Sequence, residues 1–350
     1  MSTPDPTPSP IPSSIRPPRA NPLLLGHEAA ERTLLDAIRL HRTHHAWLIT
    51  GPDGIGKATL AFRFARRLLA GRADTGTLAL DPSDPVFRRV VAGGHADMMT
   101  LERAVDEKTK RLKRDIAIAD VRKINGFMAL TPAEGGWRVV IVDGAEDLNQ
   151  NSANALLKIL EEPPPRAVLI LVCSAPGRLL PTIRSRCRHL RLSPLADDVM
   201  RRLLAEYLPE RSADDRDRLA TLAEGSIGRA LAMAADDGIA VAALVDNLMA
   251  ALPNVPAGRG HDVADALGRN ETGFRLFTDQ LIAGIAALVR DSVRGRVDQE
   301  QQRLVALRPL EAWGEVWQGL LKLQDETERF ALDKRQALVT CVGMLTGKMS

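Results

Sequence analysis

The run Gly-Pro-Asp-Gly-Ile-Gly-Lys-Ala-Thr at residues 51–59 has the composition and spacing of a loop that binds phosphate. It matches the pattern G-x-x-x-x-G-K-[ST] from Gly51 to Lys57, but Ala58 stands where the pattern has a hydroxyl residue. Glycines let backbone N–H groups turn toward a phosphate, and a lysine at the start of the next helix adds a positive charge. The absent hydroxyl is the one that would bind Mg²⁺. The sequence therefore predicts a nucleotide cradle with an incomplete metal site; the alternative is a chance glycine turn before an ordinary helix.

Two later strand ends supply further candidate groups. Asp143 closes an apolar run that begins at Trp137, and a carboxylate in that place organises Mg²⁺ directly or through water; the alternative is a loop carboxylate that caps the next turn. Ser174 closes the next apolar run, where a small polar residue either senses a γ-phosphate or simply starts a turn. The expected cofactors are ATP in the cradle and Mg²⁺ at Asp143. The full set of expected nucleotide contacts is Gly51, Asp53, Gly54, Ile55, Gly56, Lys57, Ala58, Thr59 and Ser174.

Hydrolysis of ATP needs one more group that the sequence lacks. In ATP-hydrolysing proteins of this type a glutamate follows the strand-end aspartate and orients the attacking water, but here the following residue is Gly144. Glu146 is near in the sequence, yet it would need an unusual loop to reach the same spot. We therefore expect hydrolysis by this chain alone to be weak or absent.

The elements that must position these residues follow from the hydrophobic pattern. Strands are expected at the apolar runs, which lie at 47–49, 97–101, 115–119, 137–143 and 167–174. Helical spacing of apolar residues alternates with them, at 26–42, 60–70, 120–130, 152–162 and 177–183. This alternation is typical of an α/β fold whose parallel sheet is covered on both faces. Further along the chain only helical patterns occur, at 197–207, 213–223, 226–236 and throughout 238–350.

The same pattern divides the chain into four parts. Residues 1–22 carry eight prolines and are expected to be a disordered tail. Residues 23–194 hold the α/β domain with the phosphate-binding loop, residues 195–240 a small helical domain, and residues 241–350 a third, all-helical domain.

Composition limits the possible functions. A net charge of +3 is too small to indicate nucleic-acid binding by itself, and an aromatic content of 3% leaves few platforms for stacked bases. The three cysteines are far apart and form no C-x-x-C pair, which argues against zinc and disulfides and suits a reducing cytoplasm. No apolar run is long enough to span a membrane, and the N-terminus has no signal-peptide pattern. We therefore expect a cytoplasmic protein without zinc.

A basic run at residues 103–114 leaves two interpretations open. It either contacts a phosphate backbone or forms a solvated hairpin. The run is short and contains Asp106 and Glu107, which favours the hairpin.

Two segments carry a specific resemblance to a known family. The chain resembles the clamp-loader family of AAA+ proteins at residues 142–164, Val-Asp-Gly-Ala-Glu-Asp-Leu-Asn-Gln-Asn-Ser-Ala-Asn-Ala-Leu-Leu-Lys-Ile-Leu-Glu-Glu-Pro-Pro, and at residues 179–187, Leu-Leu-Pro-Thr-Ile-Arg-Ser-Arg-Cys. The resemblance extends over about residues 22–240. It implies an AAA+ nucleotide-binding domain at 23–194, a helical lid at 195–240 and a helical collar for oligomerisation at 241–350.

The family motif Ser185-Arg186-Cys187 gives Arg186 a role by resemblance. It implies that Arg186 is an arginine finger, which acts in trans on the ATP of a neighbouring subunit. From its chemistry alone, Arg186 is an ordinary surface arginine.

Several departures from the family's motor subunits concern hydrolysis. Ala58 and Gly144 lack the expected groups, Arg229 is displaced by one residue in the run that begins at Gly225, and the family's four-cysteine zinc knuckle is absent. A shift of one residue turns a side chain by about 100° round a helix. The resemblance thus implies a subunit of a DNA polymerase holoenzyme with no polymerase site of its own and weak or no ATPase. Whether the chain is itself an enzyme stays open.

The resemblance also implies partners. They are the loader's gamma/tau-type motor subunits and its delta subunit, and, through the assembled complex, the sliding clamp and primed DNA. Two alternatives remain, an ATP-hydrolysing motor subunit of gamma/tau type and a free-standing AAA+ regulator that binds DNA. ATP hydrolysis by the isolated chain would favour the first, and tight, salt-sensitive DNA binding would favour the second.

Overall fold

The computed structural model describes residues 16–71, 76–105, 113, 115–235, 238–267 and 272–347. Most of the expected tail, residues 1–15, and most of the basic run, residues 106–112 and 114, lie outside the described residues. The chain divides into two compact units, one ending at Leu231 and the other beginning at Ala232.

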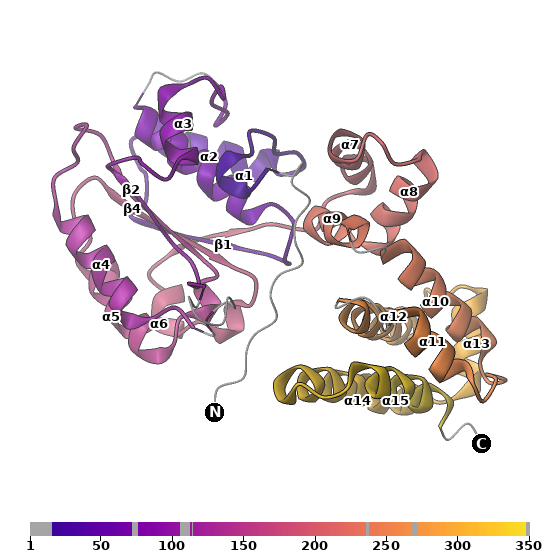
Figure 1. Cartoon of the computed structure of the whole chain (residues 1–350). Coiled ribbons are helices and arrows are strands. Elements are labelled where there is room, and N and C mark those ends of the chain that lie inside the picture. Colours follow the sequence, from indigo (N-terminus) through magenta and orange to yellow (C-terminus); the bar gives the residue numbers. More distant parts are fainter. Residues whose placement is uncertain are drawn as a thin grey trace. The chain divides into compact units, whose positions relative to one another are not determined.

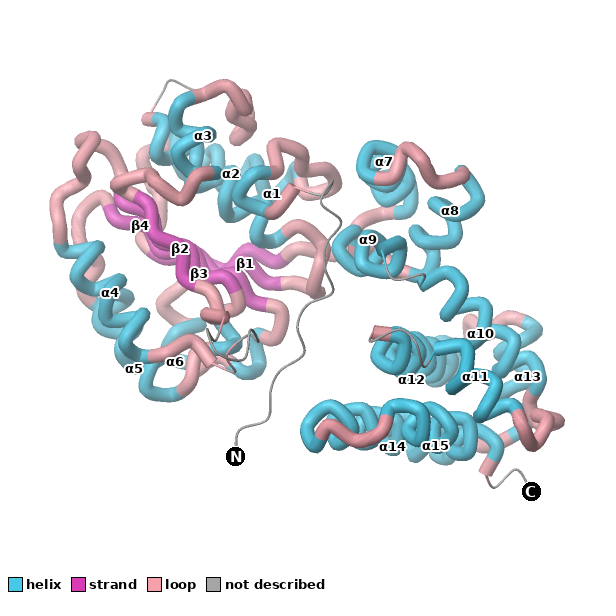
Figure 2. Tube along the Cα trace, in the orientation of Figure 1, coloured by secondary structure: helices cyan, strands magenta, loops and turns pink. Residues whose placement is uncertain are grey.

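The unit up to Leu231 is built on a parallel sheet of five strands in the order β2-β3-β4-β1-β5. The strands are β1 (Ala46–Thr50), β2 (Met98–Leu101), β3 (Arg138–Asp143), β4 (Ala167–Cys173) and β5 (Arg188–Arg191). Figure 1 shows α1, α2 and α3 on one face of the sheet and α4, α5 and α6 on the other, and Figure 2 shows the sheet between them. The expected α/β fold with a doubly covered parallel sheet is confirmed.

Helices surround the sheet and then follow it in the chain. Those that flank the sheet are α1 (Glu28–Arg39), α2 (Lys57–Ala70), α3 (Pro85–Val91), α4 (Ile118–Ala129), α5 (Gln150–Glu161) and α6 (Pro181–Arg184). The next three are α7 (Asp197–Tyr207), α8 (Ala213–Leu222) and α9 (Ile227–Ala235), and single 3-10 turns lie at η1 (Pro18–Ala20), η2 (Ala145–Asp147) and η3 (Pro176–Arg178).

Alternate residues of each central strand enter two separate cores. In β1, Trp47 and Ile49 belong to the core shared with Phe64 of α2. Leu48 belongs to the core on the other face, with Leu156 of α5. Side chains on a strand point to opposite faces in turn, so a strand buried on both sides must be apolar throughout. This requirement is why β1, β3 and β4 appear in the sequence as apolar runs.

Three local predictions were wrong or incomplete. Residues 115–119 are not a strand, because α4 already begins at Ile118 and Ile116 makes only an isolated bridge. Helix α3 lies inside a segment that reads as loop, where Asp84 caps it by accepting a hydrogen bond from the N–H of Val86. Strand β5 was missed because it is the edge strand, and of its four residues only Leu190 is buried.

The unit from Ala232 onward is helical throughout its described residues. Its helices after α9 are α10 (Gly238–Ala251), α11 (Arg259–Leu267), α12 (Gly273–Val293), α13 (Gln299–Leu307), α14 (Leu310–Phe330) and α15 (Lys334–Thr346). They share one core, in which Trp313, Phe274 and Phe277 are the largest buried side chains. Among the described helices of the chain, none combines the length and the apolar character needed to cross a membrane.

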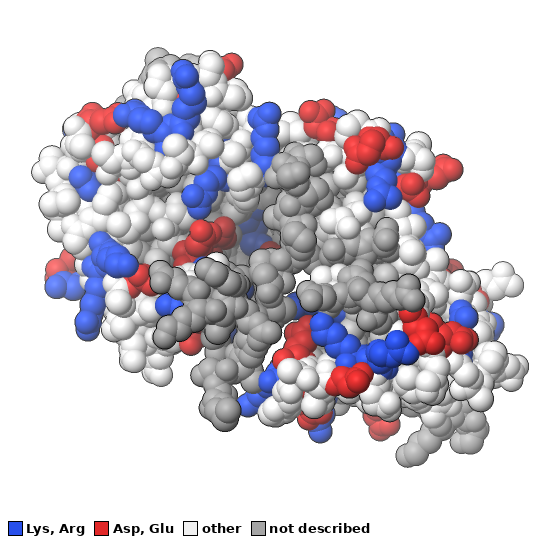
Figure 3. All heavy atoms as spheres, in the orientation of Figure 1, with Lys and Arg blue, Asp and Glu red and all other residues white. Residues whose placement is uncertain are grey.

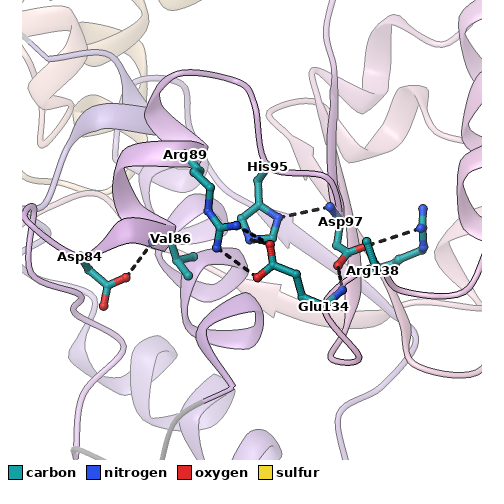
Figure 4. Close-up of polar contacts among 8 residues, drawn as sticks. Asp84, Val86, Arg89, His95, Asp97, Glu134 and Arg138 are labelled. Carbon is teal, nitrogen blue, oxygen red and sulfur yellow. Dashed lines mark hydrogen bonds and ion pairs between the residues drawn. The ribbon is translucent and has the colours of Figure 1, made fainter.

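A buried polar network fixes the turn that leads into β3 (Figure 4). The Asp97 carboxylate accepts hydrogen bonds from the N–H of Glu134 at 3.0 Å and from the N–H of the preceding residue at 2.7 Å, and it pairs with Arg138 at 3.4 Å. Arg89 forms a two-point ion pair with Glu134, and His95, whose pKa is lowered by burial, accepts from the Asp97 N–H. The Asp97–Arg138 ion pair is buried and both Asp97 oxygens accept backbone hydrogen bonds, which favours one geometry. The network therefore anchors the start of the strand that ends at Asp143.

The expected tail is packed against the domain in its last part. Arg66 of α2, which is 1% exposed, donates to the carbonyl oxygens of Arg19 and Asn21, both at 2.9 Å. Burial lowers the pKa of Arg66 to about 10, so it remains charged at neutral pH. Asn21 also donates to the Tyr207 hydroxyl at 2.8 Å. Residues 16–22 are therefore an ordered strap rather than disordered tail, because a buried arginine needs their carbonyl oxygens.

Removal of the strap should destabilise the first unit. We compare chains that begin at residue 16 and at residue 23, which differ only in residues 16–22. The shorter chain should lose roughly 3 kcal/mol of unfolding free energy, because Arg66 is left buried without its acceptors. Urea unfolding measures the difference, and equal midpoints for the two chains would contradict the strap assignment.

Candidate functional site

Parallel register brings the expected site residues to one edge of the sheet. Thr50, the last residue of β1, pairs with Cys173 of β4, and Asp143 at the end of β3 pairs with Val172. The loop after β1, the turn after β3 and Ser174 after β4 therefore start side by side. Crevices at the carboxyl ends of parallel strands are where open α/β sheets bind ligands.

The loop after β1 has the tight glycine conformation that the sequence predicts. Gly51 has a φ of 151°, and a Cβ atom there would lie 2.6 Å from the carbonyl oxygen of Leu192. Helix α2 begins directly after the loop, at Lys57, and ends at Gly71 in the left-handed conformation. Strand, glycine loop and helix thus follow one another as a phosphate-binding loop requires.

Three successive carbonyl groups of the loop, at residues 53–55, are hydrogen-bonded from outside. The Ser226 hydroxyl donates to the first at 2.8 Å, and the N–H of Gly228 donates to the second at 2.8 Å. The third lies 2.7 Å from Nε2 of His27, a bond that requires the Nε2–H tautomer. The N–H of each planar trans peptide points opposite to its carbonyl, so the loop's N–H groups face away from these partners.

Helix α9 approaches the loop more closely than a side chain would allow. A Cβ atom on Gly228 would lie 2.8 Å from the Cα atom of Gly54. Ser226 also accepts a hydrogen bond from the N–H of Arg229 at 3.2 Å, so its hydroxyl caps α9 and holds the loop together. The displaced Arg229 pairs with Glu224 at 4.0 Å. No sequence pattern predicts this contact, because it joins segments that only the fold brings together.

Lys57 lies buried at the base of the loop. Its ammonium donates to the Pro52 carbonyl at 2.6 Å and lies 3.9 Å from a carboxylate oxygen of the exposed Asp53. Burial lowers the pKa of Lys57, and the carboxylates of Asp53, Glu146 and Asp143 oppose that shift. A lysine held at this place supplies a positive charge to the concave side of the loop.

The two residues that follow Lys57 in α2 differ in whether they carry a hydroxyl group. Ala58 has no hydroxyl to give, and Thr59 is 7% exposed. The structure thus leaves the metal side of the loop without the usual hydroxyl ligand.

Asp143 and Glu146 bring two carboxylates to this edge. Burial raises the pKa of Asp143 to about 6, with a further contribution from the charge of Glu102. Gly144 adopts the left-handed conformation, with a φ of 81°, and begins the η2 turn. This turn carries Glu146 across to β4, where its Oε1 accepts from the N–H of Ser174 at 2.8 Å. The sequence indicates that Glu146 needs an unusual loop to approach this edge, and the left-handed turn at Gly144 is such a loop.

The acidic pair suits a magnesium ion that is shared with a nucleotide. Mg²⁺ is usually held by one or two carboxylates together with substrate phosphates and water. Asp143 and Glu146 supply such oxygen atoms, and MgATP would complete the set. Among the described residues, no group of three His, Cys, Asp or Glu side chains could hold a metal on its own. The described part of the chain also has its three cysteines free and buried.

Arg186 lies apart from these groups, after α6. Its guanidinium pairs with Glu161 at the end of α5 at 2.8 Å and donates to the Thr182 carbonyl at 3.0 Å. The side chain is 36% exposed. Ser185 bonds the same carbonyl, while Cys187 is buried and burial raises its pKa to about 12. The motif thus has a buried cysteine as its anchor and presents the arginine at the surface.

A side chain at residue 228 should separate α9 from the loop. Gly228→Ala places a Cβ atom against Gly54, which should lower the unfolding free energy by about 1–3 kcal/mol. Gly126→Ala in α4 is the control, because its Cβ atom would meet open space and alanine favours a helix. Chemical unfolding of wild type and both variants measures this effect. A Gly228→Ala variant that is as stable as wild type would contradict the close contact between α9 and the loop.

The raised pKa of Asp143 predicts a pH-dependent cost. Above pH 6 the charge of Asp143 destabilises the folded chain. In EDTA at pH 8, Asp143→Asn should therefore unfold at a higher temperature than wild type, with a free energy of unfolding larger by about 1–3 kcal/mol. As the pH falls through 6 toward 4, the folded wild type binds the proton first, and the advantage of the variant should vanish. Asp325→Asn, at an exposed carboxylate, is the control. If the difference in unfolding free energy between Asp143→Asn and wild type is the same at pH 8 and pH 4, Asp143 does not have a raised pKa.

Comparison with known proteins finds subunits of DNA polymerase III among the proteins that this chain is similar to. The model of the family described as "DNA polymerase III, delta subunit" matches residues 26–196. DNA polymerase III subunit delta' of Pseudomonas aeruginosa is 39% identical over 183 residues, covering 52% of this chain and 53% of that protein. DNA polymerase III subunit tau of Escherichia coli is 32% identical over 216 residues, covering 60% of this chain and 32% of that protein.

The similarity is partial in length. The chain spans about half the length of the first of these relatives and about a third of the second. A solved gamma subunit-related protein from Thermotoga maritima covers 91% of this chain and 100% of its own, at 20% identity and a TM-score of 0.40, which is too low to carry an argument. Residues 26–196, which hold the phosphate-binding loop, the acidic strand end and the Ser-Arg-Cys motif, are the part of the chain that is similar to this family and to these DNA polymerase III subunits.

Proposed function

We propose that this chain is a delta-prime-type, stator-like subunit of a DNA polymerase III clamp loader. In this role it takes part in the ATP-dependent loading of a sliding clamp on primed DNA. One observation carries the proposal: the Ser-Arg-Cys motif presents Arg186 at the surface, while the chain's own cradle lacks a hydroxyl at Ala58 and a carboxylate at Gly144. The identity to the delta' subunit of Pseudomonas aeruginosa supports the same assignment.

The chain's own cradle is proposed to bind ATP and to hydrolyse it slowly or not at all. The loop N–H groups and Lys57 would hold the phosphates, and Ser174 would lie beside the γ-phosphate. Asp143 would hold Mg²⁺, which neutralises phosphate charge when it is bound. Without a glutamate at residue 144, no side chain at that position orients an attacking water.

Arg186 is proposed to act on a neighbour. A guanidinium placed against the γ-phosphate of another subunit's ATP stabilises the charge that develops during transfer. Its present ion pair with Glu161 is exposed, with the glutamate 51% accessible, and such pairs contribute about 0–1 kcal/mol. Release of Arg186 to a partner would therefore cost little. The partners proposed are the gamma/tau-type motor subunits and the delta subunit.

The proposed division of labour follows the predicted domains. Residues 23–194 would bind nucleotide and residues 195–240 would act as the lid. Residues 241–350 would be the collar that holds the subunits together. The all-helical core of α10 to α15 supports the collar assignment, since subunit contacts need a stable helical frame.

Replacement of the finger tests the proposal. In a reconstituted loader, Arg186→Ala should lower ATP turnover at the adjacent motor site by roughly 10³-fold, the range for an arginine finger, and should abolish most clamp loading. Arg178→Ala, at an exposed arginine of the same segment, should leave both unchanged. Assembly is checked by gel filtration. Normal loading by a complex that contains Arg186→Ala would reject the finger.

One observation favours a second candidate, an ATP-hydrolysing gamma/tau-type motor subunit. Glu146 lies at the strand edge although residue 144 is glycine. Steady-state hydrolysis by the isolated chain, abolished by Lys57→Ala, would support this candidate. A free-standing DNA-binding regulator has less support, because basic and acidic side chains are interspersed over the described surface in the view of Figure 3.

A further inference from the structure

Glu146 is held in one position at the edge where the cradle opens. It belongs to the η2 turn, which begins with Gly144 in the left-handed conformation directly after β3. Its Oε1 accepts from the N–H of Ser174, the residue that follows β4, at 2.8 Å. Strand β4 pairs with both β3 and β1, so this bond places the carboxylate between the end of β3 and the start of the phosphate-binding loop. The side chain thus spans two strand ends instead of pointing to solvent.

The second carboxylate oxygen of Glu146 has no strong partner. Oε2 is buried, and no hydrogen bond reaches it within the described residues. Burial, the charge of Glu146 and a side-chain hydrogen bond to Glu146 raise the pKa of the neighbouring Cys173 thiol to about 12, but a thiol is only a weak donor. A buried carboxylate oxygen without a donor or a cation is costly. A purely structural role at the end of β4 explains the hydrogen bond that Oε1 accepts. It does not explain why Oε2 is buried without a strong donor.

The charges around Glu146 favour a bound cation. Glu146 and Asp143 each lie within electrostatic range of Lys57 and of one another, as their mutual effects on pKa indicate. Two further carboxylates nearby are exposed, those of Asp53 and of Glu102, which pairs with Arg19. Lys57 therefore faces two negative charges at close quarters, and a polyphosphate would add more. A divalent cation would balance this arrangement.

We propose that the Glu146 carboxylate, reaching across from η2, completes the metal side of the nucleotide site in place of residue 144 and the absent hydroxyl at residue 58. Asp143 and Glu146 together hold the cation of a nucleotide triphosphate complex, either directly or through its water. This inference rests on the proposed binding of nucleotide by the cradle. It concerns binding, and it is independent of the role proposed for Arg186.

The test compares nucleotide affinity with and without metal. A fluorescent, non-hydrolysable ATP analogue is titrated into the full chain in Mg²⁺ and in EDTA, and the ratio of the two Kd values is the readout. Glu146→Gln keeps an Oε1 that can accept from Ser174 but removes the charge. The variant should lose about tenfold or more of the Mg²⁺-dependent gain, the range for loss of a group that holds or orients a metal ligand. In EDTA it should bind at least as tightly as wild type, because a charge that repels phosphate is gone.

Controls separate this role from a structural one. Glu210→Gln, at an exposed carboxylate, should keep the wild-type ratio. Glu146→Ala should show the same loss of ratio as Glu146→Gln, and it replaces that variant if the latter does not fold.

Three outcomes would overturn the proposal. An unchanged ratio would show that Glu146 does not serve the metal, and equal weakening in both buffers would make its role structural. Absence of nucleotide binding by wild type would remove the ligand altogether, while clamp loading that depends on Arg186 could still be measured in the assembled complex.

Discussion

The shape of the phosphate-binding loop depends on hydrogen bonds to its own carbonyl groups. Three successive carbonyls accept from His27, Ser226 and Gly228, and the Ser226 partner lies 173 residues away in sequence. A tight glycine loop has little intrinsic preference for one conformation, so outside partners must select it. Because Gly54 and Gly228 touch backbone to backbone, any movement of α9 would alter the loop itself. The loop and the start of α9 therefore form one mechanical unit.

The same edge of the sheet carries more negative than positive charge. Asp143 is buried at a cost, as the rise of its pKa to about 6 indicates, and Glu146 adds a second carboxylate beside it. Lys57 alone does not offset them. Proteins retain such unfavourable charges where a ligand later compensates for them. The loss of the hydroxyl at Ala58 thus need not mean the loss of metal binding, since the acidic side of the site is stronger than its sequence motif indicates.

The α/β architecture could be predicted because strands buried on both faces must be apolar without interruption, as in 137–143 and 167–174. Strand β5 could not be, since an edge strand with one buried residue leaves no such run. The loop residues 51–57 were recognisable from their spacing, but the contact with Gly228 was not, because it joins distant segments. The position of Glu146 depends on the left-handed conformation of Gly144. A glycine allows this conformation, but its presence in the sequence does not predict it.

The strap at residues 16–22 has a consequence for the order in which the domain assembles during synthesis. These residues leave the ribosome before the helices that they contact, and Arg66 can donate to their carbonyl oxygens as soon as α2 has formed. The bond from Asn21 to Tyr207 must wait until α7 has emerged. Strand β1 waits in the same way, since its partners begin only at Ala167 and Arg188. Strand β1 therefore has both edges unpaired until β4 and β5 have been made, and the pairing of these two strands with it completes the sheet.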